Sequence, residues 1–123
     1  MKRIKQIDTY LEASGTDLTA LDQQALDRYA SRFGRDYCRT GCDDCEGHCL
    51  AGVPIASILR YQMYFEDYGE EKQAMQSYAA LGRNAAACLG CDLESCTAGC
   101  PHGLSVALKV RSAHRSLSLE AIA

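Results

Sequence analysis

The chain has few of the features that mark several large protein classes. Its 123 residues include no tryptophan, two phenylalanines and two prolines. No apolar run approaches the roughly 20 residues that a membrane-spanning helix needs. The formal net charge is −3, so there is no excess of positive charge for binding nucleic acid. We therefore expect neither a nucleic-acid partner nor a membrane span.

Sequence signatures of catalysis and of secretion are also missing. The chain contains no glycine-rich phosphate loop, no nucleophile elbow and no zinc-protease motif. We expect no catalytic residues in it, although it can form part of an oxidoreductase. Its start, MKRIKQIDTYLEASG, has no apolar stretch of signal-peptide length. This favours a reducing compartment, and we expect the protein to be cytoplasmic.

Cysteine, by contrast, is abundant and tightly grouped. Eight cysteines form two runs, C-x3-C-x2-C-x3-C and C-x2-C-x4-C-x3-C-P. Each run supplies four thiolates, the number that holds one [4Fe–4S] cluster, and the second ends in proline as ferredoxin motifs do. The runs predict two [4Fe–4S] clusters, and hence one-electron transfer, with metal ligands Cys38, Cys42, Cys45, Cys49, Cys88, Cys91, Cys96 and Cys100.

Two other uses of these cysteines remain open. Small secreted domains use cysteines as disulfide staples, but such staples usually link distant segments rather than neighbours within one run. Two zinc sites with four cysteines each would also use every thiolate, and the chain would then be a structural interaction domain. Zinc sites more often pair two C-x2-C knuckles across a loop. His48 and His102 lie beside the last cysteines of their runs. We expect them outside the ligand set, because eight thiolates complete two sites.

The remaining sequence predicts helices. Apolar residues recur at helical spacing over 4–14, 18–33, 54–69, 70–82 and 104–117. Scarce proline and plentiful alanine and leucine agree with this interpretation. We predict an all-α fold, with an N-terminal helical segment over 1–36 and a two-cluster domain over 37–123.

A repeat with an offset of 51 residues relates the two cysteine motifs. Each motif is a cysteine loop followed by a helix, and we expect the two units to pack about a pseudo-twofold axis. The matched residues are Cys45, Cys49, Gly52, Val53, Ile55 and Ala56 with Cys96, Cys100, Gly103, Leu104, Val106 and Ala107.

The long helical spacer between the runs resembles that of the α-helical ferredoxin domain. Such domains occur in the iron–sulfur subunits of succinate dehydrogenase and fumarate reductase and in heterodisulfide reductases. More closely, the chain resembles the C-terminal ferredoxin region of some bacterial aldo/keto reductases over nearly its whole length. The strings that carry this resemblance are YCRTGCDDCEGHCLAGVPI (37–55), LRYQMYFEDYG (59–69) and CLGCDLESCTAGCPHGL (88–104).

The resemblance implies an electron-transfer module that is the C-terminal part, or a small partner, of an aldo/keto-reductase-like oxidoreductase. Its partner would be a redox protein or a covalently attached reductase domain. The (β/α)8 barrel of that family is missing here, because residues 1–36 are too few to form it. No catalytic residue of the barrel has a counterpart in this chain.

Two-cluster ferredoxins exchange one ligand between motifs, so that the fourth cysteine of each run serves the other cluster. On that pattern, Cys38, Cys42, Cys45 and Cys100 would hold one cluster, and Cys88, Cys91, Cys96 and Cys49 the other. Ligation within each run is the alternative. Leu50 stands where the common pattern has proline, and both runs have altered spacings, so the loops depart from ordinary ferredoxins.

Overall fold

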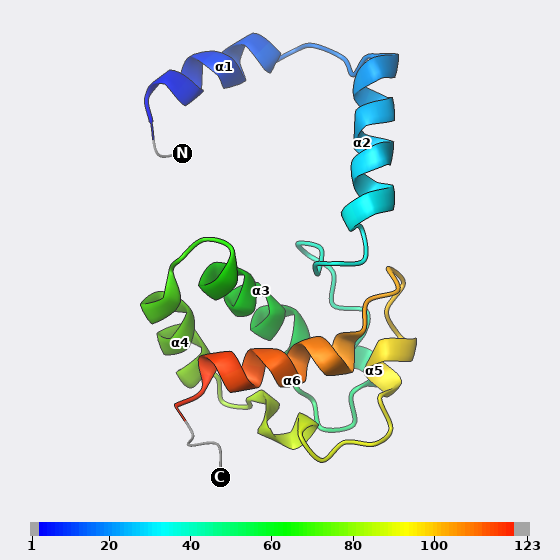
Figure 1. Cartoon of the computed structure of the whole chain (residues 1–123), viewed down its shortest axis with the longest axis vertical. Helices are drawn as coiled ribbons and strands as arrows, with labels where there is room; N and C mark the ends of the chain where they lie inside the picture. Colours follow the sequence, from blue (N-terminus) through cyan, green and yellow to red (C-terminus); the bar gives the residue numbers. More distant parts are fainter. Residues whose placement is uncertain (1–2, 120–123) are drawn as a thin grey trace. The chain divides into compact units, whose positions relative to one another are not determined.

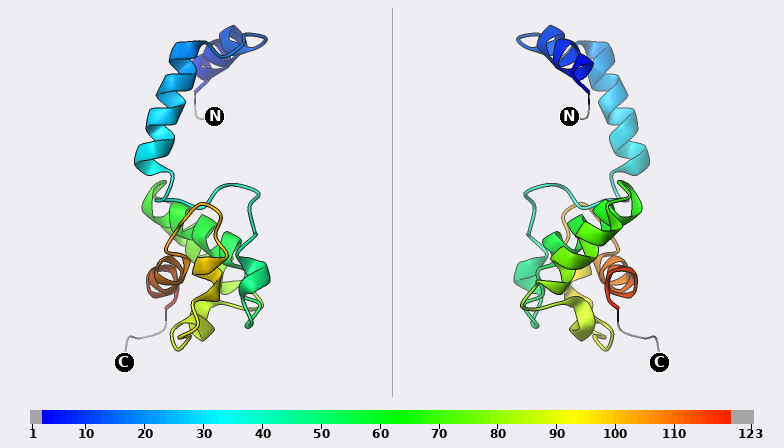
Figure 2. Two further views of the ribbon diagram at one scale, coloured as in Figure 1. Left: turned by 90° about the vertical axis from the view of Figure 1, so that its right-hand side faces the viewer. Right: turned by 90° about the vertical axis from the view of Figure 1, so that its left-hand side faces the viewer.

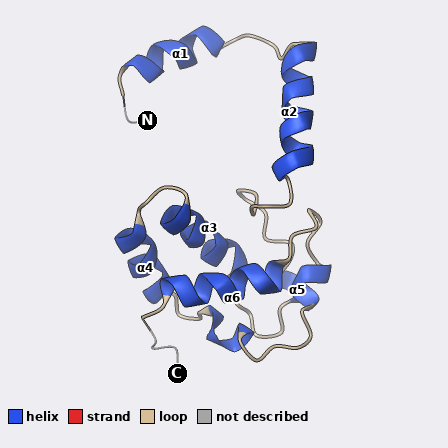
Figure 3. Ribbon diagram, in the orientation of Figure 1, coloured by secondary structure: helices blue, strands red, loops and turns tan. Residues whose placement is uncertain are grey.

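The structure, a computed structural model, describes residues 3–119. Within this range the regular elements are all helices and there is no strand (Figures 1 and 3). The all-α class predicted from the sequence is therefore confirmed. None of the helices within residues 3–119 combines the length and the apolar character that a membrane span requires. The chain divides into two compact units, Met1–Arg32 and Phe33–Ala123, which are described separately.

The first unit consists of α1 (Lys5–Ala13) and most of α2 (Ala20–Phe33). Thr19 and Asp22 cap the start of α2 reciprocally, as in a capping box. The Thr19 hydroxyl accepts the Asp22 N–H at 3.2 Å, and the Asp22 carboxylate accepts the Thr19 N–H at 2.9 Å. Neither helix contains a buried residue. The two helices therefore build no hydrophobic core of their own.

The second unit contains three longer helices and three short helical turns (Figure 2). The predicted helices over 54–69, 70–82 and 104–117 correspond to α3 (Ile55–Glu66), α4 (Glu71–Ala79) and α6 (Val106–Leu117). Helix α6 packs against α3 and α4. The short turns lie in or beside the cysteine runs and were not predicted: η1 (Glu46–His48), η2 (Ala85–Cys88) and α5 (Ser95–Ala98).

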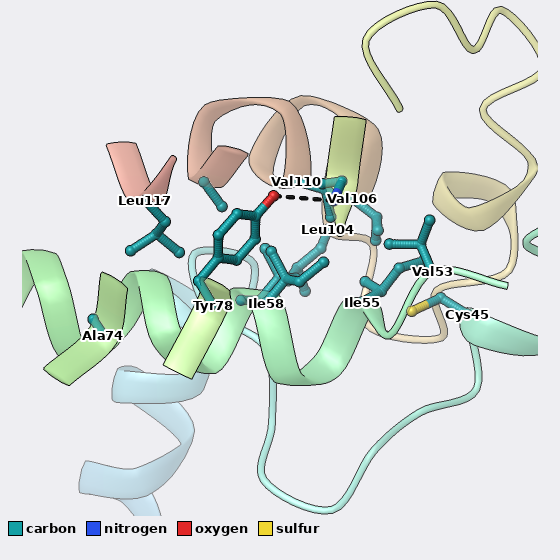
Figure 4. Packing of buried hydrophobic residues seen from close by; sticks show 13 residues of the cluster. Cys45, Val53, Ile55, Ile58, Ala74, Tyr78, Leu104, Val106, Val110 and Leu117 are labelled. Carbon is teal, nitrogen blue, oxygen red and sulfur yellow. Dashed lines mark hydrogen bonds between the residues drawn. The ribbon is translucent and has the colours of Figure 1, made fainter. Parts of the chain in front are cut away.

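The core of the second unit lies between α3, α4 and α6 (Figure 4). Its largest fully buried side chains are Ile55, Ile58, Val106, Val110 and Leu117. Full burial of such a side chain contributes about 1.5–3 kcal/mol. Cys45 belongs to this core, and several other cysteines pack against it. The helices and the cysteine loops are therefore parts of one packed body.

Hydrogen bonds reproduce the 51-residue repeat seen in the sequence. The Glu46 carboxylate accepts the Ala56 N–H at 2.8 Å, and the Thr97 hydroxyl accepts the Ala107 N–H at 3.0 Å. Each bond uses a side chain of the cysteine loop to satisfy a free donor in the first turn of the following helix. The same local structure is thus built twice, which fixes each cysteine loop to its own helix.

Candidate metal centres

None of the eight cysteines forms a disulfide, and they gather in two places. Cys45 is buried and the other seven are half-buried. We call Cys38, Cys42, Cys45 and Cys100 the first cysteine site, and Cys49, Cys88, Cys91 and Cys96 the second cysteine site.

The second cysteine site surrounds a cavity of about 120 Å³ that all four of its thiols line. Cys49 reaches this cavity from the loop before α3, whereas the other three cysteines come from the second run. A single water needs only about 10–15 Å³ of such a cavity. The second cysteine site therefore offers room for a group of several atoms, surrounded by soft sulfur ligands.

The electrostatics of Cys88 show the same grouping. Burial is the main cause that raises its pKa, to about 11, and charge on the neighbouring thiols Cys49, Cys96 and Cys91 raises it further. Cys49 has the largest effect of the three, although it belongs to the other run. The Arg111 guanidinium acts in the opposite direction. Cys49 is thus an electrostatic neighbour of the second run.

The first cysteine site is joined in the same way by Cys100. Burial raises the pKa of Cys45 to about 12, and the charges of Cys38 and Cys100 add to the increase. The pKa of Cys38 is also raised, first by burial and then by Cys42 and Cys100. Cys100 comes from the second run and acts on two thiols of the first.

The structure therefore brings together the eight predicted ligands in the two sets that exchanged ligation requires. What the structure shows is the grouping of the thiols. The binding of metal by these thiols stays a prediction. Among residues 3–119, no group of three or more histidine, cysteine, aspartate or glutamate side chains is arranged to hold a single metal ion.

Arg111 on α6 is a site residue that was not predicted from the sequence. Its Nε donates to the Cys88 carbonyl at 2.9 Å, and its Nη2 donates to the Cys91 carbonyl. Its Nη1 forms an ion pair with Glu94 at 2.7 Å, and both side chains line the cavity of the second cysteine site. One guanidinium thus fixes the backbone of two candidate ligands.

The repeat offers a signal that identifies Arg111. Arg60 on α3 precedes it by 51 residues, the offset that relates the two motifs. Arg60 donates to the Thr40 hydroxyl at 2.9 Å. Its positive charge lowers the pKa of Cys38, against the larger effect of burial. Each helix therefore directs one arginine back to the loop of its own cysteine run.

The other polar residues around the runs lie mostly in solvent. The side chains of Asp43, Asp44, Asp92 and His48 are exposed, and His102 is half-buried. The His48 backbone nevertheless links the two motifs, because its carbonyl accepts the Ser95 hydroxyl at 2.6 Å. This bond helps to hold the second motif against the first.

Comparisons of the chain with protein-family models, with curated proteins and with solved structures find no match. The resemblance to aldo/keto reductase ferredoxin regions therefore remains a hypothesis drawn from the sequence.

Proposed function

We propose that this chain is an electron-transfer module that binds two [4Fe–4S] clusters, one at each cysteine site. The observation that carries the proposal is the cavity shared by Cys49 with Cys88, Cys91 and Cys96. Four soft thiolates around one cavity suit an iron–sulfur cluster, which needs more room than a single ion. A cluster bound there would take up and release one electron at a time.

The chain's own residues hold and shield these sites. Deprotonated thiolates would ligate the iron, with Cys49 and Cys100 linking the two motifs. The hydrogen bonds of Glu46 and Thr97 to the following helices hold the loops in place. Ile55, Ala107 and Val110 form apolar walls of the second cysteine site, which limit the access of water.

The partner we propose is an oxidoreductase of aldo/keto reductase type, either covalently attached or separate, in a reducing compartment such as the cytoplasm. The support is the resemblance of the cysteine strings to the ferredoxin region of that family. The 51-residue repeat further supports an α-helical ferredoxin arrangement with two equivalent halves. On this proposal the chain carries electrons and the attached reductase performs the catalysis.

The test is the iron and acid-labile sulfide content per chain after anaerobic purification, with visible spectra before and after dithionite. We expect about eight of each, from the stoichiometry of two clusters, and bleaching on reduction. The triple variant Cys88→Ser, Cys91→Ser and Cys96→Ser should retain about half of both. Stoichiometric zinc without sulfide, even after anaerobic reconstitution, would overturn the proposal and support a structural zinc domain.

A further inference from the structure

The guanidinium of Arg111 is held at the wall of the second cysteine site by three groups. They are the Cys88 carbonyl, the Cys91 carbonyl and the Glu94 carboxylate. The Arg111 side chain is 19% exposed, whereas that of Glu94 is 45% exposed. Water and salt therefore screen the carboxylate more strongly than the guanidinium. The less screened charge of the pair at the cavity wall is therefore the positive one.

The first cysteine site has a weaker counterpart. Within the part of the chain that the structure describes, Arg60 donates to the Thr40 hydroxyl and to no carbonyl of a candidate ligand. Glu46, the half-buried residue that directly follows Cys45, adds charge of the opposite sign. The two sites are thus alike in local structure and different in electrostatic field.

We propose that Arg111 raises the reduction potential of the second cysteine site above that of the first. This inference rests on the proposed function, because it concerns a site that carries a cluster. Reduction adds one electron, supplied by an external one-electron reductant, and no bond is broken. The added negative charge is stabilised by a fixed positive charge nearby, so the site with Arg111 is reduced first. The hydrogen bonds of Arg111 also fix the orientation of the Cys88 and Cys91 carbonyls at the cavity.

The experiment is an anaerobic redox titration of the full chain, followed by electron paramagnetic resonance. We expect two reduction steps in the wild type. Arg111→Gln should lower the upper midpoint potential and leave the lower one in place. Arg111→Lys keeps the charge without the forked hydrogen bonds, and its upper midpoint should fall less. Arg60→Gln is the matched control, and it should move only the lower step.

Glu94→Gln provides a test of opposite sign that does not depend on the folding of Arg111→Gln. Removing the carboxylate leaves the guanidinium charge unopposed, so the upper midpoint should rise. The inference is overturned if the variants keep their iron and sulfide but the upper midpoint potential is unshifted in Arg111→Gln or lowered in Glu94→Gln. A wild-type chain without iron or sulfide would instead contradict the proposed function itself.

Discussion

The hydroxyl of Tyr78 lies 2.5 Å from Nδ1 of His114 in the core and joins α4 to α6. The same hydroxyl accepts the N–H of Ala85 at 3.0 Å, the bond drawn in Figure 4. The direction of the bond between this hydroxyl and Nδ1 is set by the His114 tautomer. Ala85 begins η2, the turn that ends in Cys88. Tyr78 therefore connects two core helices to the turn that carries a candidate ligand.

Replacing Tyr78 by phenylalanine should destabilise the protein strongly. The change keeps the ring but removes the partner of the buried Ala85 N–H and one hydrogen bond of His114. Leaving a buried polar group unsatisfied costs about 1–3 kcal/mol, so we expect a loss of about 2–4 kcal/mol in the free energy of unfolding. Anaerobic urea unfolding of the cluster-containing protein, followed by circular dichroism, measures this loss.

Tyr68→Phe is the matched control, because Tyr68 is 58% exposed on the segment after α3. It should change the unfolding free energy by less than about 0.5 kcal/mol, as surface substitutions usually do. Equal effects of the two variants would show that the Tyr78 hydroxyl makes no special contribution.

The exchange of Cys49 and Cys100 can be tested by removing one half of the ligands. The triple variant Cys88→Ser, Cys91→Ser and Cys96→Ser should keep one cluster, held by the first cysteine site. In this background, adding Cys100→Ser should abolish the remaining iron and sulfide, whereas adding Cys49→Ser should leave both unchanged. The reason is that only Cys100 lies with the thiols that remain.

Ligation within each run predicts the reverse outcome for the same pair of variants. Iron and sulfide content per chain is the readout, and serine is close in size to cysteine. A cluster that survives Cys100→Ser and is lost with Cys49→Ser would show that the exchange is wrong.

The longer helices could be predicted from the sequence because their burial follows helical periodicity. In α6, Val110, Ala113, His114 and Leu117 recur at helical spacing and are all buried. In α3, by contrast, the apolar residues Met63 and Phe65 are only half-buried. The short turns η1, η2 and α5 could not be predicted, because turns of three or four residues carry no periodic pattern and depend on contacts such as that of Tyr78 with Ala85.

The cysteine ligands of the candidate site could be predicted from the sequence, whereas the residues that reach the site through tertiary contacts could not. Thiols in two runs indicate ligands whatever the rest of the chain does. Arg111 lies on an amphipathic helix, where a charged residue ordinarily indicates the solvent face. Its contacts with Cys88 and Cys91 exist only after the second loop folds back onto α6. The repeat that links it to Arg60 was the one sequence signal of its role.

Gly103 should be intolerant of a side chain although space is available around it. Its φ is +68°, and a Cβ would meet only the Arg35 side chain at 3.7 Å. The left-handed conformation costs an ordinary residue about 1–2 kcal/mol, so Gly103→Ala should lose about that much stability. Gly47→Ala is the control, because Gly47 has no positive φ and a Cβ added there would meet no atom within 4 Å. Urea unfolding should separate the two variants, and equal stability would contradict the backbone argument.

High pH should weaken the fold of the metal-free, thiol-reduced chain. In the folded state burial raises the pKa of Cys45 to about 12 and that of Cys88 to about 11, from an ordinary value of 9.0. Between about pH 9 and about pH 12 the unfolded chain has therefore lost protons that the folded chain still holds, and stability falls as the pH rises through this window. Below about pH 9 both states hold these protons, and the contribution to stability is fully present. Far-UV circular dichroism should show that helix content falls across this pH window. The fall should be less steep in Cys45→Ala, where the remaining pH dependence comes from the other ionising groups, including tyrosines and lysines. A helix content that stays constant or rises would contradict the burial of these thiols.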